Sequence, residues 1–305
     1  MSASGGTAPV LRRRSKILSQ RGTAVDINVE AVKVEVIKPA IGAVVHVDRK
    51  AIFEPAVAHR IMELLEIHDA LIFPQINLSD EEQLAFTDAL GARVNFTHTA
   101  PGGSKKNDVY EITLDKDKNP EPEYVLGTFF WHMDGATINI PVPKASVLSC
   151  RKASPTGGQT QFCNTYAAYE ALPEAEKKAI ENLRVVHSVV AAVREVATAD
   201  QLEPFKRGAA HEQPLVWTRK NGRKSLMIGY SADYIVGMTK AEGRALLVRL
   251  LEWAAQPQFC YSHDWKEGDL AIWDNGGALH RVIPYPADSG RTMHRTSIAG
   301  LEPTN

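Results

Sequence analysis

The chain has 305 residues, 44% of them hydrophobic, and its 35 basic and 36 acidic side chains nearly cancel. Such a balance gives no electrostatic footprint for nucleic acid or an anionic membrane, so we expect a small-molecule partner. The sequence has no apolar run of about 18 residues, which argues against a membrane span, and it begins without the apolar core of a secretory signal. Three widely spaced cysteines, Cys150, Cys163 and Cys260, predict neither a disulfide framework nor a zinc–cysteine site, which favours a reducing, cytoplasmic setting.

Residues 1–25 are small, basic and free of acidic side chains. We interpret this segment as a disordered basic tail, although a transit peptide has a similar composition. The remaining residues, 26–305, contain no internal repeat and no long flexible linker, so we expect them to form a single domain.

Hydrophobic spacing predicts the first elements of this domain. Alternating valines over 32–36 and the apolar run at 41–47 predict two strands. Apolar residues at helical spacing from Val57 to Leu65 predict a helix, which is followed by a short apolar strand at 70–73.

Two helix starts carry the pattern of a capping box, in which a serine or threonine precedes a glutamate by three positions. Ser79 with Glu82 predicts a helix that ends at Gly91, and Thr239 with Glu242 predicts a second helix. The other expected elements are a polar surface loop at 102–123, strands near 137–150 and 185–192, a helix over 165–183 broken by Pro173, and antiparallel strands at 214–217, 225–230, 268–275 and 295–300. Strands dominate this pattern, which predicts a mainly β domain with helices packed outside.

His132 and Asp134 lie two positions apart in the segment FFWHMDG. On an extended chain such residues point to the same side, so the imidazole and the carboxylate would converge. His280, just beyond a predicted strand, is the candidate third ligand. Two histidines and one carboxylate on one face of an iron ion leave positions open for a chelating cosubstrate and oxygen. Taken alone, a histidine and an aspartate at this spacing are more often an ordinary hydrogen-bonded pair.

Two arginines follow the third candidate ligand. Arg291 and Arg295 are four positions apart, so on a strand both side chains would lie on the same face. Guanidinium groups suit a two-point grip on carboxylates, whereas the simpler interpretation is a pair of solvated surface charges.

The chain resembles the TauD/TfdA family of iron(II)- and 2-oxoglutarate-dependent dioxygenases from about residue 32 to 302. The motifs that carry the resemblance, in this order, are GAVV at 42–45, HDALIFPQINLSDEEQLAFTDALG at 68–91, WHMD at 131–134, GGQT at 157–160, AAYEALP at 167–173, GRKSLMIG at 222–229, GDLAIWDNGGALHR at 268–281 and RTMHRTSIAG at 291–300. It implies a double-stranded β-helix (jelly roll) that binds Fe(II) and uses 2-oxoglutarate and O2.

The resemblance also assigns roles to single residues. It implies that His132, Asp134 and His280 hold the iron. It implies that Thr160 and Arg291 bind the distal carboxylate of 2-oxoglutarate.

Further positions follow from the same resemblance and from the local sequence. Arg295 matches the arginine that grips the anionic group of the primary substrate. Thr128 stands where the family commonly has an asparagine that contacts the substrate. Trp273, Asp274 and Asn275 are interpreted as groups that stabilise the strand end and orient His280.

The expected function is hydroxylation of a small organic anion, either a carboxylate, a sulfonate or a sulfate ester, in some cases with cleavage of the product. A homo-oligomer is left open. The alternative is a non-catalytic jelly-roll binding or sensor protein with a vestigial site. A halogenase is disfavoured, because that chemistry needs a small residue in place of Asp134.

Overall fold

The structure is a computed structural model that describes residues 32–94, 109–119, 122–137, 141–206 and 210–304. The basic tail predicted at 1–25 lies outside these residues. Within the described part of the chain, no helix combines the length and the apolar character needed to cross a membrane.

A seven-stranded sheet forms one wall of the domain, with the strand order β1-β2-β3-β13-β5-β15-β4. Its neighbouring strands run antiparallel except for β2 and β3, which are parallel. The strands are β1 Val32–Val36, β2 Ala43–Val47, β3 Ala70–Phe73, β4 Tyr110–Ile112, β5 Ala145–Lys152, β13 Leu270–Asp274 and β15 Thr292–Ile298.

A three-stranded antiparallel sheet, β12-β6-β14, forms the opposite wall. Its strands are β6 Thr160–Asn164, β12 Cys260–His263 and β14 Ala278–Val282. One buried cluster joins Phe162 of this sheet with Leu148, Trp273 and Met293 of the large sheet. The inner faces of the two sheets therefore pack against each other, as in the jelly roll that the family resemblance implies.

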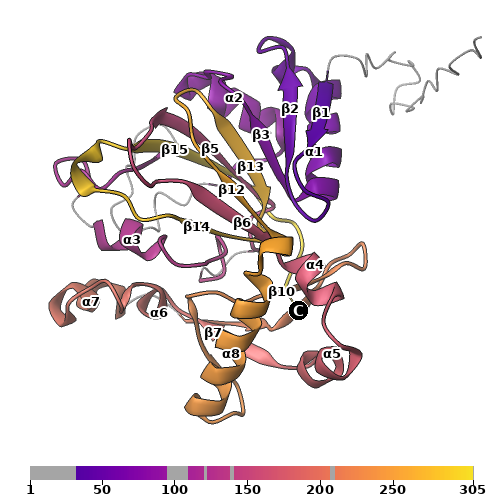
Figure 1. Cartoon of the computed structure of the whole chain (residues 1–305), viewed down its shortest axis with the longest axis vertical. Helices are drawn as coiled ribbons and strands as arrows, with labels where there is room; N and C mark the ends of the chain where they lie inside the picture. Colours follow the sequence, from indigo (N-terminus) through magenta and orange to yellow (C-terminus); the bar gives the residue numbers. More distant parts are fainter. Residues whose placement is uncertain (1–31, 95–108, 120–121, 138–140, 207–209, 305) are drawn as a thin grey trace, which may run out of the picture.

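Two helices cover the outer face of the large sheet, α1 at Pro55–His68 and α2 at Asp80–Leu90 (Figure 1). Ile61 of α1 and Phe86 of α2 are fully buried in one cluster with Val147 and Ile272 of the sheet. Strand residues consequently alternate between a face that meets these helices and a face that meets the barrel interior.

The chain between β6 and β12 forms a second layer with its own apolar cluster. Figure 1 shows these elements together in its lower half. They are the helices α4 Thr165–Glu170, α5 Glu174–Ile180, α6 Val189–Val193, α7 Ala199–Lys206 and α8 Lys240–Ala254, and the strands β7 Arg184–His187, β8 His211–Pro214, β9 Val216–Thr218, β10 Lys224–Leu226 and β11 Ala232–Ile235. The remaining helices among the described residues are α3 Pro122–Gly127 and the short 3-10 turns at Ala51–Phe53, Pro257–Phe259 and Ala287–Ser289.

The predicted local elements are largely confirmed. Both capping boxes are formed, at the starts of α2 and α8, and Gly91 caps the end of α2. The strand predicted near 185–192 is wrong in its second half. There the Ser188 hydroxyl accepts a hydrogen bond from the backbone of Ala191 and starts α6 instead. The polar loop predicted at 102–123 contains β4, whose Tyr110 is buried against β15, while 102–108 lie outside the described residues.

The structure corrects the expectation drawn from the cysteines. Cys163 and Cys260 form a disulfide, while Cys150 is buried as a free thiol. The two bonded residues lie directly opposite each other in the antiparallel pair β6 and β12, with their Cα atoms 4.2 Å apart. Their separation of 97 residues in sequence hides this register, which only the folded sheet creates.

Candidate active site

Three side chains beside β14, an edge strand of the small sheet, converge. The ligand atoms of His132, Asp134 and His280 all lie within 4.8 Å of one another. His280 comes from β14, whereas His132 is held beside it by an isolated antiparallel bridge with two backbone hydrogen bonds. The predicted convergence is confirmed, but His132 and Asp134 lie on a bridge and the turn after it, not on a continuous strand.

The two histidines are held as neutral ligands. The Nδ1 of His132 donates to the backbone oxygen of Phe130 at 2.8 Å, which leaves the Nε2 lone pair free. Burial lowers the pKa of His132, and it lowers the pKa of His280 to about 3. Both imidazoles therefore remain neutral at neutral pH, and each can give a nitrogen lone pair to a metal cation.

Asp134 supplies the negative charge of the cluster. Burial by itself would raise the pKa of Asp134, but the charge of Arg295 and the hydrogen bond from Ser146 hold it below its ordinary value. Arg295 Nη1 donates to Oδ1 at 2.8 Å, and Ser146 donates to Oδ2 at 2.6 Å. An ionised carboxylate with two neutral imidazoles is a donor set that suits iron(II), so the residues present fit the metal.

The expected cosubstrate residues lie in the barrel interior. Thr160 and Arg291 are 99% and 98% buried, and Gly158 packs directly against the Arg291 side chain. Arg291 Nη2 has no hydrogen-bond partner among the described residues. Because a buried unpaired guanidinium nitrogen is costly, this atom fits a site built for an anionic ligand. Burial lowers the pKa of Arg291 from a very high ordinary value, and the group stays charged.

Sequence reasoning missed the group that orients Thr160. Trp265 donates its indole N–H to Thr160 Oγ1 at 2.9 Å, so the threonine hydroxyl proton is directed elsewhere. The only hint in the sequence is the position of Trp265 two residues after His263, the end of β12.

A pocket opens onto His132 and Asp134. Among the described residues that line this pocket, Arg295 is the one arginine or lysine, and its side chain is largely buried. Most of the other lining residues present apolar surface, and they include Tyr110, Ile112, Tyr124, Val125, Val189, Ala192 and Val193. Thr128 also lines the pocket, but its hydroxyl donates to the backbone oxygen of Val125 at 2.7 Å. The hydroxyl proton of Thr128 is already used in this hydrogen bond, so its oxygen can accept a hydrogen bond from a substrate but cannot donate one.

The residues at the end of β13 match the expectation only in part, because Asp274 pairs with Lys144 and Arg219 rather than with His280. Trp273 does pack on His280, with ring centroids 4.6 Å apart. Asn275 instead donates to Ser146 at 3.0 Å, and Ser146 in turn binds Asp134. Asn275 is therefore linked through Ser146 to Asp134, and not to His280.

A jelly roll that gathers two histidines and one carboxylate at the barrel mouth defines the class of mononuclear iron dioxygenases. The sequence profile described as "Taurine catabolism dioxygenase TauD, TfdA family" matches residues 33–297. This chain belongs to that family.

Named relatives and solved structures agree with this assignment. The chain is 32% identical over 273 residues to an alpha-ketoglutarate-dependent 2,4-dichlorophenoxyacetate dioxygenase of Burkholderia sp. (strain RASC), covering 85% of this chain and 91% of that protein. It is 30% identical to an alkylsulfatase of Acinetobacter baylyi, covering 77% and 76% of the two chains. The crystal structure of AAD-2 in complex with Mn(II) and N-oxalylglycine superposes with a TM-score of 0.73 at 31% identity, covering 90% of this chain and 99% of that one.

The protein is accordingly an iron(II)- and 2-oxoglutarate-dependent dioxygenase that uses O2. These comparisons support the enzyme and not the non-catalytic binding or sensor protein considered as its alternative.

Proposed function

We propose that the enzyme hydroxylates a small organic anion with an aromatic body, of the aryloxyalkanoate class. The observation that carries the proposal is the single guanidinium of Arg295 in an otherwise mainly apolar pocket beside His132 and Asp134. An aryloxyalkanoate has one carboxylate to pair with this charge and one apolar ring to fill the remaining space. The 2,4-dichlorophenoxyacetate dioxygenase that resembles this chain supports this choice over sulfonates and sulfate esters.

In this proposal His132, Asp134 and His280 hold iron(II). Thr160 and Arg291 bind the distal carboxylate of 2-oxoglutarate, the threonine through its hydroxyl proton and the arginine through its unpaired Nη2. When bound, iron(II) and 2-oxoglutarate supply activation of O2, with succinate, carbon dioxide and a hydroxylated substrate as products.

The chain itself contributes orientation and exclusion of water. Arg295 would hold the substrate carboxylate, while Ile112, Val125 and Val193 would enclose the ring and keep solvent from the reacting carbon. Thr128 would form part of the pocket wall. If the hydroxylated carbon also bears the ether oxygen, the product collapses with cleavage of that carbon–oxygen bond.

Succinate formation over a matched panel of substrates tests the proposal. The panel contains aryloxyacetates, alkylsulfonates and alkyl sulfate esters, each supplied with iron(II), 2-oxoglutarate and O2. We expect the aryloxyacetates to stimulate succinate formation most, with a phenol released in equal amount. Stimulation by the sulfur compounds alone would reject the aryloxyalkanoate assignment and leave the dioxygenase reaction standing.

A further inference from the structure

Ser146 is a fully buried serine on β5 whose side chain faces the barrel interior. Its hydroxyl lies 2.6 Å from Asp134 Oδ2 and 3.0 Å from Asn275 Nδ2. The three polar groups thus form a chain that begins at the turn after β13 and ends on the carboxylate of the metal cluster.

The direction of this chain follows from the chemistry of its members. An ionised carboxylate can only accept, so the one hydroxyl proton of Ser146 must point to Asp134. The Ser146 oxygen can then accept on its other side, where the NH2 group of Asn275 donates to it. If the Asn275 amide were flipped, its oxygen would face the Ser146 oxygen, and lone pairs on both atoms would repel each other.

The same hydrogen bond determines how the Asp134 carboxylate is turned. Oδ2 accepts from Ser146 and lies 3.7 Å from His280 Nε2, while Oδ1 accepts from Arg295. Each oxygen retains a lone pair, and two donors on opposite oxygens fix the plane of the group.

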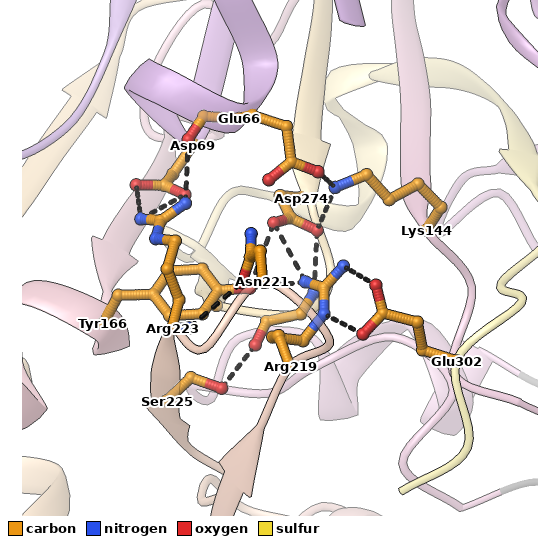
Figure 2. A network of polar contacts seen from close by, with 12 residues as sticks. Glu66, Asp69, Lys144, Tyr166, Arg219, Asn221, Arg223, Ser225, Asp274 and Glu302 are labelled. Atoms are coloured by element: carbon orange, nitrogen blue, oxygen red, sulfur yellow. Dashed lines mark hydrogen bonds and ion pairs between the residues drawn. The ribbon is translucent and has the colours of Figure 1, made fainter. Parts of the chain in front are cut away.

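A cluster of buried charges fixes the turn that carries Asn275. Asp274, which has no exposed surface, lies between Lys144 at 3.3 Å and Arg219 at 3.4 Å, as Figure 2 shows. The Asp274 carboxylate also accepts from the backbone of Gly276, and the backbone of Asn275 donates to the Lys144 oxygen. Asn275 is therefore held at its backbone by groups that do not touch the metal cluster.

We propose that Ser146 and Asn275 are positioning residues that set the Asp134 carboxylate for metal binding. The proposal rests on the assignment of Asp134 as a metal ligand under the proposed function. It assigns to these two residues a role beyond packing, because their hydrogen bonds select one orientation of the only anionic ligand.

Metal affinity measures this role without any turnover. Ser146→Ala should weaken binding of Co(II), titrated anaerobically and followed by its visible absorption, by ~10–100-fold. Ser149→Ala is the matched control, because Ser149 is a buried serine on the same strand whose hydroxyl makes a 2.6 Å hydrogen bond to Gln83 on the opposite face. Urea unfolding of both metal-free variants reports any general loss of stability.

Asn275→Asp is the second variant, because it keeps the shape of the side chain and removes the donor. We expect it to weaken Co(II) binding at least as much as Ser146→Ala, since two carboxylates would then compete for one hydroxyl proton. Wild-type affinity in both Ser146→Ala and Asn275→Asp, or equal weakening in Ser149→Ala, would overturn the proposal.

Asp134→Ala separates this result from a failure of the proposed function. If Asp134→Ala loses Co(II) binding while the Ser146 and Asn275 variants keep it, the ligand assignment holds and the positioning role is wrong. If Asp134→Ala binds Co(II) like wild type, both proposals fall.

Discussion

Arg295 donates a hydrogen bond to Asp134, with 2.8 Å between Nη1 and Oδ1. The arginine that is expected to grip the substrate anion therefore also touches the carboxylate that is expected to hold the metal. Arg295 helps to keep Asp134 ionised, because it lowers the pKa of that carboxyl against the effect of burial, and Asp134 in turn raises the pKa of Arg295 against burial.

Arg295→Gln should consequently affect two ligands. It keeps a hydrogen-bond donor but leaves the substrate anion without a counter-charge in a mainly apolar pocket, which costs roughly 2–4 kcal/mol of substrate binding. Metal affinity should fall by a smaller factor. Turnover of 2-oxoglutarate without substrate should persist when metal is saturating, and substrate should no longer stimulate it. Loss of this unstimulated turnover with unchanged substrate affinity would mean that Arg295 serves the cosubstrate instead.

Arg291→Ala should raise the 2-oxoglutarate concentration needed for half-saturation, because it removes a charged partner from a buried carboxylate. We expect a loss of ~2–3 kcal/mol, or about 30-fold to 150-fold in affinity. Thr160→Ala should act in the same direction but more weakly, because a neutral hydroxyl is lost. Binding of N-oxalylglycine to the Mn(II)-loaded protein, followed by calorimetry, measures both variants. Unchanged affinity in both would reject the cosubstrate site.

His187 should make the fold sensitive to acid. It is fully buried between Ser231 and the backbone oxygen of Met227, and burial lowers its pKa from 6.5 to about 4. The unfolded chain takes up a proton below pH 6.5 but the folded chain only near pH 4. The stability from the neutral ring is therefore present above pH 6.5 and is lost as the pH falls towards 4.

His187→Gln keeps a donor and an acceptor without this titration. Between pH 7 and 4 we expect wild type to lose about 3 kcal/mol more unfolding free energy than the variant. Urea unfolding at several pH values compares them, and parallel pH profiles would show that His187 carries no such linkage.

The Cys163–Cys260 bond should stabilise the domain, because it closes a long segment of chain that includes the second layer. Reduction should lower the free energy of unfolding by ~2–4 kcal/mol. Cys260→Ser should have the reduced stability from the outset and show no further response to dithiothreitol. Equal unfolding curves for oxidised and reduced wild type would contradict this prediction.

Sequence reasoning succeeded where the signal is local. The spacing of His132 and Asp134 predicted their convergence, and the capping serine and threonine predicted where α2 and α8 begin. The alternation that turns Arg295 toward the barrel interior was also visible in the chain, whereas Arg291 precedes β15 and a register shift between Thr292 and Met293 interrupts the alternation between the two arginines.

What sequence reasoning missed depends on register between distant strands. Cys163 meets Cys260 only because β6 pairs with β12 in one particular alignment. Ser146 on β5 of the large sheet meets Asp134, which follows the bridge between His132 and His280, only once the two sheets have packed together. Local patterns contain neither alignment, so no reading of either segment alone could find these contacts.

The separation of the metal ligands along the chain has a consequence for folding. His132 precedes the second layer and His280 follows it, so nearly half of the chain lies between two ligands of one proposed ion. In the unfolded chain these side chains are far apart on average, and the ion would bind them tightly only after the layer between them has folded. A bound metal would thus act as a removable cross-link, and the melting temperature should rise with free metal concentration and return to its lower value on chelation.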